Sequence, residues 1–220
     1  MLQASTIKFL KDLKKNNNKP WFEKNKLVYL DAKEDIELLV EQVIEGLGKI
    51  DSDIKPLNPK DCTYRIYRDV RFAKDKTPYK TNMGAYLNKG GKKKPTAGYY
   101  LHCEPGRNMA GGGLWMPMAP ELSKVRQEID YNFAEWTKIV GDRSFRKIFP
   151  DGLEKEDLLS RPPKGYSIEN PAIEFLKLKS FIVTRTFTDA EIQAKSFLKE
   201  ILKTFEAMGD FVHFINRSLE

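Results

Sequence analysis

The sequence predicts an α+β fold in which a mostly antiparallel sheet packs with N-terminal, middle and C-terminal helices. Apolar residues recur every three or four positions in the first fifty residues and again after Pro120, as on one face of a helix. From Asp61 to about Pro117 the period changes to two, which is typical of half-buried strands. The chain has no internal repeat and no break in composition, so we expect one domain over residues 1–220.

Three helices are predicted in the first fifty residues. The first follows Ser5 and ends at the asparagine run 16–18, and Pro20 suits the first turn of the second. The second helix carries a stripe at a spacing of four: Trp21, Asn25 and Tyr29. The third ends near Gly46 and Gly48 and has the clearest apolar stripe: Ile36, Leu39, Val40, Val43, Ile44 and Leu47.

Strands follow at 62–72, 83–88, 97–104 and 112–117, and the glycine- and lysine-rich turn 89–94 predicts a hairpin between the middle pair. A helix is expected after Pro120, with an apolar side formed by Leu122, Val125, Ile129, Phe133, Trp136 and Val140.

Residues 162–171 are expected to form an ordered turn region, and a last strand covers 180–187. T-D-A-E at 188–191 has the spacing of a capping box. It predicts the start of one long helix whose apolar stripe runs from Ala194 to Ile215.

Composition and charge restrict the class of protein. The chain is 40% hydrophobic and 31% charged, has no apolar run long enough for a membrane span, and begins without the apolar core of a signal peptide. We therefore expect a cytoplasmic protein without a membrane partner. Two distant cysteines and two distant histidines predict no disulfide framework and no transition-metal site, while a magnesium ion held by carboxylates stays open.

The net charge of +7 is concentrated in one segment. Residues 65–94 hold ten Lys or Arg against Asp69 and Asp75, so the rest of the chain is close to neutral. If 62–72 is a strand, Arg68 falls on its apolar face, where a charge needs a partner or an anionic ligand. Either an internal carboxylate holds Arg68, with Asp75 or a distant Glu as candidates, or the arginine awaits a ligand.

The segment predicts an anion site because arginine forks and mobile lysines match phosphate or carboxylate groups. The candidate ligand-binding residues here are Arg65, Arg68, Asp69, Arg71, Lys76, Tyr79 and Lys80, with Asp69 orienting the arginines and Tyr79 assisting. Two other interpretations stay open. One is a structural network neutralised by Asp69 and Asp75, and the other is a solvated basic face.

The motif R-x-x-R-D-x-R-F-x-x-D-K-x-P-Y-K-T, at 65–81, resembles the signature of a bacterial family of conserved hypothetical proteins, domain of unknown function 2461. The likeness extends over nearly the whole chain, through N-N-x-K-x-W-F and N-K-x-x-Y in the first thirty residues, G-G-G-L-W-x-P at 111–117, and P-K-G-Y, N-P and K-S-F within 163–181. The resemblance implies a shared single-domain fold and leaves the function open.

Three further residues complete the candidate site. Asn25 lies on the aromatic stripe of the second helix, where packing alone does not explain an amide, and Trp115 would be an apolar wall beside the glycines. Those glycines indicate a closely packed strand more than a phosphate loop, because no G-K-[ST] follows them. His102 alternates with Tyr100 and Glu104 on one strand face, which makes it a candidate general base or a merely hydrogen-bonded histidine.

His213, between two phenylalanines, is expected to pack or cap. No serine lies in a nucleophile-elbow pattern, so the sequence leaves open whether the protein is an enzyme, and it names no cofactor and no oligomeric state.

The leading hypothesis is a protein that binds a small phosphate- or carboxylate-bearing ligand. The first alternative is a nucleic-acid-binding module that uses the basic hairpin lysines with tyrosines as stacking faces: Lys89, Lys92, Lys93, Lys94, Tyr64, Tyr67, Tyr79 and Tyr86. The second is an interaction protein whose charge network is purely structural.

Overall fold

The computed structural model describes residues 1–220. Four strands form one antiparallel sheet in the order β1-β2-β3-β4, and eleven helices accompany it, so the predicted α+β class is confirmed. The strands are β1 (Met83–Asn88), β2 (Gly98–Cys103), β3 (Asn108–Leu114) and β4 (Phe181–Phe187).

The N-terminal helices are α1 (Ala4–Lys15), α2 (Lys19–Lys24), α3 (Lys26–Leu47) and the short α4 (Pro59–Cys62). Pro20 lies in the first turn of α2, as predicted, and the Asn18 side chain caps that turn by accepting from the Trp21 N–H. The predicted second helix is interrupted at Asn25, which ends α2 and precedes α3. Trp21 and Tyr29 therefore do not share one continuous helix.

The hairpin between β1 and β2 is confirmed, with Asn88 opposite Gly98 and both Gly90 and Gly91 at positive φ in the turn. The glycine strand is also closely packed. A Cβ at Gly111, Gly112 or Gly113 would lie 2.0–2.1 Å from a carbonyl oxygen of a neighbouring strand. β3 starts and ends earlier than the predicted 112–117, and Trp115 beyond it is 71% exposed.

The predicted strand 62–72 is wrong. This segment pairs with β1 only near Thr63, where the Tyr64 N–H donates to the Gly84 carbonyl at 2.9 Å, and it then leaves the sheet. Phe72, at the end of this segment, is 96% exposed. An alternating segment without a partner strand leaves its backbone N–H and C=O groups without hydrogen bonds. This segment forms some of those hydrogen bonds by folding back on itself.

The middle helices are α5 (Ala119–Tyr131), α6 (Phe133–Gly141), α7 (Arg143–Ile148) and α8 (Ile173–Leu176), so the single helix predicted after Pro120 is broken at Asn132. Residues 162–171 contain no helix or strand, as expected of a turn region.

The C-terminal helices are α9 (Asp189–Gln193), α10 (Phe197–Ala207) and α11 (Gly209–Leu219). The capping box at Thr188 and Glu191 is confirmed. It opens only α9, because Ala194 adopts an extended conformation and Met208 separates α10 from α11. The predicted long helix is therefore three short ones.

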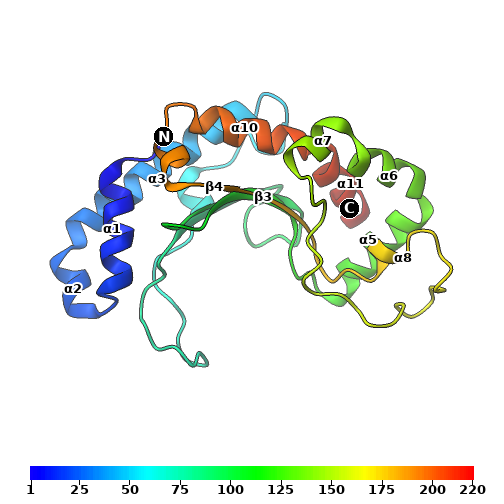
Figure 1. Ribbon diagram of the computed structural model, residues 1–220, viewed down its shortest axis with the longest axis horizontal. Coiled ribbons are helices and arrows are strands. Elements are labelled where there is room, and N and C mark those ends of the chain that lie inside the picture. The colour runs from blue at the N-terminus through cyan, green and yellow to red at the C-terminus, as the bar shows by residue number, and fades with distance from the viewer.

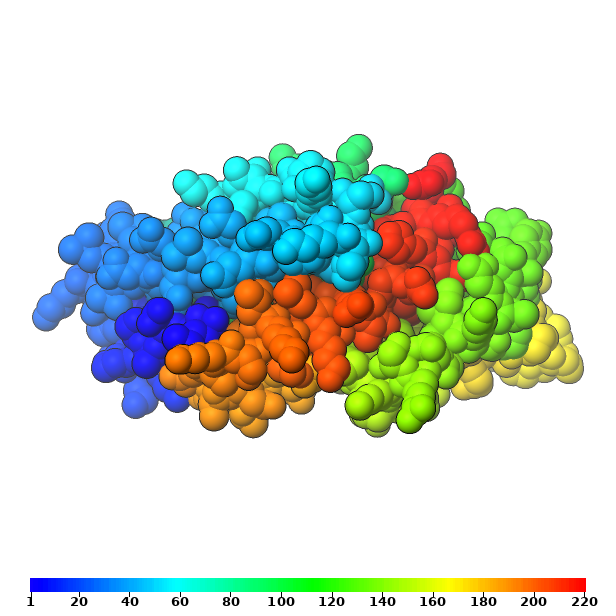
Figure 2. Space-filling view, turned by 90° about the horizontal axis from the view of Figure 1, so that it is seen from above, coloured from blue at the N-terminus to red at the C-terminus, as the bar shows by residue number.

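The sheet has one covered face and one open face. Helices α3 and α10 pack against it from above in Figure 1, α11 packs on β3 toward the right-hand end of the sheet, and α1 packs on α3. Seen from above in Figure 2, the helices form a continuous surface. Figure 1 shows the other helices at the two ends of an arch and none crossing beneath the sheet.

We call the lower surface the open face. Since side chains alternate along a strand, Tyr99 of β2 points up to Phe205 of α10, and Tyr100 points down to the open face. The 47 buried hydrophobic residues form one cluster on the helical side and at the ends of the arch. No helix combines the length and apolar character needed to cross a bilayer.

Candidate functional site

Residues 64–81, which we call the basic arm, fold back on themselves and project below the sheet in Figure 1. Two backbone hydrogen bonds close the arm: the Lys80 N–H donates to Ile66 at 2.7 Å, and the Arg68 N–H donates to Pro78 at 2.9 Å. The arm is anchored to the N-terminal helices at Tyr79. Tyr79 stacks on Phe22 with ring centroids 4.0 Å apart, and the Asn17 amide bonds both its backbone N–H and its carbonyl.

Arg68 is held by the arm itself. Its guanidinium donates to an Asp75 carboxylate oxygen at 2.5 Å and to the carbonyl and hydroxyl of Thr77. The Thr77 N–H and then the Arg68 guanidinium lower the pKa of Asp75 to about 2. The choice between an internal carboxylate and a waiting cation is thus decided in favour of Asp75, which is one of the candidates named from the sequence.

Other charged residues of the predicted site are also engaged within the arm. Arg71 donates to both oxygens of Asp69, at 3.0 and 2.6 Å, and this bonding lowers the pKa of Asp69. Lys76 donates to the carbonyls of Val70 and Arg71. Asp69 therefore orients Arg71, whereas Asp75 orients Arg68.

Two predicted residues lie outside this network. The Asn25 amide donates to the Trp21 carbonyl at 2.8 Å, at the junction of α2 and α3. Trp115 stands exposed just after β3. Neither forms a hydrogen bond with the arginines of the arm.

Three cations at the root of the arm have no carboxylate partner: Arg65, Lys80 and Lys92, which we call the cation cluster. The ammonium groups of Lys80 and Lys92 lie 5.2 and 5.1 Å from the centre of the Tyr64 ring. Lys92 also donates to the Thr63 carbonyl. Burial, followed by the charges of Arg65 and Lys92, lowers the pKa of Lys80, and burial lowers the pKa of Lys92.

Beside the cation cluster, a hydrogen-bonded chain crosses the open face. The Tyr64 ring meets the Tyr100 ring edge-on at 6.5 Å, and the Tyr100 hydroxyl lies 2.9 Å from His102 Nδ1. His102 Nε2 lies 3.3 Å from a Glu104 carboxylate oxygen, and the Thr81 hydroxyl donates to the other oxygen at 2.7 Å.

The protonation of this chain follows from its surroundings. Burial lowers the pKa of His102, against the opposing effect of Glu104. Burial would raise the pKa of Glu104, but the hydrogen bonds from Thr81 and His102 outweigh it and the pKa is lowered. A neutral His102 beside a carboxylate carries its proton on Nε2, so Nδ1 accepts from the Tyr100 hydroxyl. Burial raises the pKa of Tyr100 to about 12, so the tyrosine keeps its proton and shares it with His102 only as a hydrogen bond.

The basic hairpin is partly neutralised. Lys89 pairs with Glu220 at 2.6 Å and with Asp53 at 3.6 Å, and Lys92 belongs to the cation cluster. Of the four hairpin lysines, only Lys93 and Lys94 have side chains without an ion pair or hydrogen bond.

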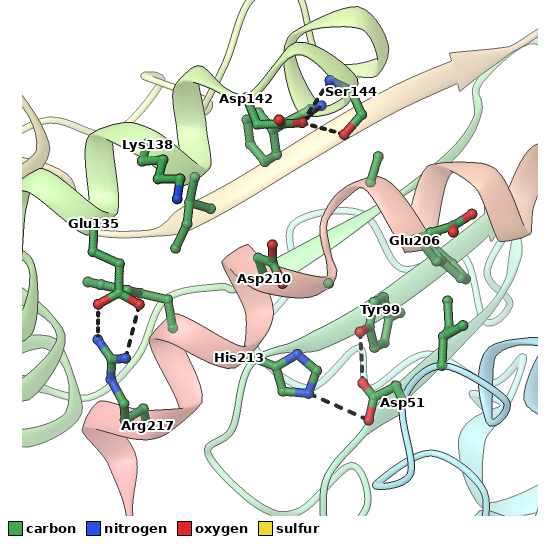
Figure 3. A pocket seen from close by; sticks show the side chains of 17 residues that line it. Asp51, Tyr99, Glu135, Lys138, Asp142, Ser144, Glu206, Asp210, His213 and Arg217 are labelled. Atoms are coloured by element: carbon green, nitrogen blue, oxygen red, sulfur yellow. Dashed lines mark hydrogen bonds and ion pairs between the residues drawn. The ribbon is translucent and has the colours of Figure 1, made fainter.

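A cavity of about 640 Å³ lies on the helical side of the sheet, and none of the predicted site residues lines it (Figure 3). Its lining includes His213, which was expected to pack or cap. Instead, the His213 side chain is 54% exposed, with Nε2 3.8 Å from the Asp51 carboxylate.

Sequence reasoning placed Arg65, Lys80 and His102 in the site but assigned Lys92 only to the hairpin and Tyr64 only to the nucleic-acid alternative. The signal for Tyr100 and Glu104 was present, because both share the strand face of His102. The sequence could not place Lys92 in the site, because only the fold of the basic arm brings Tyr64 beside the hairpin that carries Lys92.

A family model described as a conserved hypothetical protein (DUF2461) matches residues 5–214. No curated protein matches the chain significantly. No solved structure does so either.

Proposed function

We propose for this chain, which belongs to the DUF2461 family of conserved hypothetical proteins, that it binds a small phosphate- or carboxylate-bearing ligand at the cation cluster. The observation that carries the proposal is the contrast within the basic segment. Arg68 and Arg71 have carboxylate partners at 2.5 and 2.6 Å, whereas Arg65, Lys80 and Lys92 have none.

Like charges destabilise a fold when their counterions are distant, and here Asp61 acts on Lys92 and Asp69 acts on Arg65 without forming an ion pair with them. Lys80 and Lys92 approach the same ring, so their ammonium groups lie within about 10 Å of each other. At that separation two unit charges repel by about 0.4 kcal/mol in water and about 1.7 kcal/mol at an effective dielectric constant of 20. A bound anion removes this repulsion and gains charge-assisted hydrogen bonds, which supports a ligand site.

The open face adds groups that suit such a ligand. The Tyr64 ring offers an apolar surface between the lysines, and the Tyr100 hydroxyl is oriented by His102. The proposal therefore gives the cation cluster the role of anchor, and it gives Tyr100 the position nearest a reacting group if the ligand is a substrate.

The test is the thermal midpoint in inorganic phosphate and in sodium chloride at equal ionic strength, which separates site binding from screening. For a Kd of about 1 mM, about 50 mM phosphate stabilises the folded state by about 2.3 kcal/mol. That corresponds to a rise of about 5–9 °C for a domain of this size. Citrate in place of phosphate distinguishes a carboxylate ligand from a phosphate ligand.

The double variant Lys80→Met, Lys92→Met should lose the rise. Lys93→Met is the matched control, because Lys93 lies in the same turn without a polar partner and should keep it. Equal midpoints of the wild type in phosphate, citrate and chloride would refute the proposal, as would an equal loss in the control.

The nucleic-acid alternative predicts a different result. Fluorescence anisotropy with a labelled single-stranded oligonucleotide would then show an affinity that falls steeply with salt. It would also fall in Lys93→Met, which the small-ligand proposal leaves unchanged.

A further inference from the structure

The Tyr100 hydroxyl is the part of the hydrogen-bonded chain that a ligand on the open face can reach. His102 and Glu104 are only 4% and 8% exposed, whereas Tyr100 is partly exposed. The Tyr100 ring meets the Tyr64 ring, beside the cation cluster, edge-on at 6.5 Å. What Tyr100 offers to a ligand therefore depends on where its single hydroxyl proton lies.

Glu104 determines which nitrogen of His102 carries the proton. One carboxylate oxygen of Glu104 accepts from the Thr81 hydroxyl at 2.7 Å. The other lies 3.3 Å from His102 Nε2 and 3.3 Å from Arg107 Nε. Burial lowers the pKa of His102, so its ring is neutral at about pH 7.5 and carries one proton. That proton lies on Nε2, which faces an ionised carboxylate that can only accept, and Nδ1 is left without a hydrogen.

Nδ1 of His102 takes up the only donor of Tyr100. The Tyr100 hydroxyl oxygen lies 2.9 Å from Nδ1 and donates to it. Burial raises the pKa of Tyr100 to about 12, so the hydroxyl does not ionise near neutral pH. A hydroxyl has one hydrogen and two lone pairs. Toward the open face, Tyr100 therefore presents a hydrogen-bond acceptor and no donor.

The groups beside Tyr100 have the opposite character. Arginine and lysine side chains, which make up the cation cluster, can only donate. An anionic oxygen fits the cation cluster, but at Tyr100 it would meet a lone pair and no hydrogen. The group that contacts Tyr100 must therefore be a donor. An ammonium group would also donate, but the neighbouring cations repel it, which leaves a hydroxyl.

We propose that the ligand of the cation cluster carries, besides its phosphate or carboxylate group, a hydroxyl group that donates to the Tyr100 oxygen. The ligand is the one of the proposed function, on which this inference rests. The ligand class is thereby narrowed to hydroxylated carboxylic acids and hydroxylated phosphate esters. Tyr100 is the residue that distinguishes them from the same acids and esters without the hydroxyl.

Two pairs of probes test the proposal. Glycerol 3-phosphate and propyl phosphate share the charge and the carbon chain and differ only in hydroxyl groups. Citrate and propane-1,2,3-tricarboxylate differ only in the central hydroxyl. The pairs cover the two kinds of anion that the proposed function leaves open. Each is titrated at about pH 7.5 and at constant ionic strength, so that screening is equal within a pair.

The binding is followed by NMR through the imidazole signals. The chain has two histidines, so His102 reports on the site and His213, on the helical side of the sheet, is an internal control. Long-range proton–nitrogen correlation spectra of the same sample also show the tautomer directly. We expect Nδ1 of His102 to be the nitrogen without a proton.

In the wild type, the hydroxylated member of the pair that binds should bind about tenfold more tightly than its partner. Tyr100→Phe removes the acceptor and keeps the ring, so the two members should then bind equally. Tyr67→Phe is the matched control. Tyr67 lies on the basic arm, is 43% exposed and has a hydroxyl without a hydrogen bond, so this variant should keep the tenfold preference.

The outcomes separate this inference from the proposed function. Equal affinity within a pair in the wild type overturns the inference and leaves the anion site in place. A preference that survives in Tyr100→Phe, or a proton on Nδ1 of His102, does the same. So do probes that raise the thermal midpoint without moving the His102 signals, because they bind away from Tyr100. If no probe raises the midpoint or moves these signals, the proposed function fails, and the inference fails with it.

Discussion

Gly113→Ala tests whether the glycines of β3 serve strand packing. Gly113 has φ +118, and a Cβ there would lie 2.0 Å from the Phe181 carbonyl oxygen and 2.9 Å from a ring carbon of Phe211. Ordinary contacts of this kind begin near 3.4 Å, so β4 would have to move away by more than an ångström. A shift of that size breaks hydrogen bonds between strands that lie about 4.8 Å apart.

The expected loss of stability combines two costs. Backbone strain at an unfavourable φ costs about 1–3 kcal/mol, and overpacking costs about 1–3 kcal/mol. Their sum, about 2–6 kcal/mol, corresponds to a fall in the midpoint of about 4–24 °C. Thermal and urea unfolding followed by circular dichroism measure it directly.

Two other glycines separate these costs. Gly106 has φ +80, but a Cβ added there would meet no atom within 4 Å, so Gly106→Ala should show the strain alone. Gly141, the last residue of α6, has neither constraint, and Gly141→Ala should be neutral or stabilising. If Gly113→Ala loses no more stability than Gly106→Ala, the packing argument fails.

Four further outcomes are expected. Arg68→Met should lower the midpoint by only about 2–4 °C, well short of the fall for a buried pair, because its partner Asp75 is 61% exposed. Since the folded-state pKa of Asp75 is about 2, below its ordinary 3.8, its contribution is present above pH 4 and lost as the pH falls toward 2, so the midpoints of wild type and Asp75→Asn should converge there. Trp136→Ala, at a fully buried ring, should cost about 3–5 kcal/mol in urea unfolding. Burial raises the pKa of Cys62 to about 11 and that of Cys103 to about 12, so a disulfide reagent should modify the native protein at least about a hundredfold more slowly than the urea-unfolded chain.

The sequence predicted best those elements that pair with a segment close to them in the chain. The β1–β2 hairpin was visible because Gly90 and Gly91 stand between two alternating runs. The breaks at Asn25 and Asn132 were not visible in the sequence, because an apolar stripe continues across each of them. In the structure each asparagine ends one helix and precedes the next.

The site was harder to predict than the fold. Spacing brought Arg65, Arg68 and Arg71 together, but it could not say which cation has an acid within reach. Asp75 binds Arg68 only because the arm turns back at Thr77. Nothing in the pattern around His213 indicated Asp51, which lies in the turn after α3 and meets α11 only in the folded protein.

The positive charge of the molecule is unevenly distributed about the sheet. Tyr99 and Tyr100 are consecutive residues, yet Tyr99 donates to the buried Asp51 carboxylate on the helical side and Tyr100 lies beside the Tyr64 ring of the cation cluster on the open face. If the net charge of +7 were spread evenly over the surface, a negatively charged matrix would retain the protein in any orientation and a positively charged matrix would not retain it. Because the excess positive charge of this protein lies in residues 65–94, we expect it to bind a negatively charged matrix through that segment and in one preferred orientation.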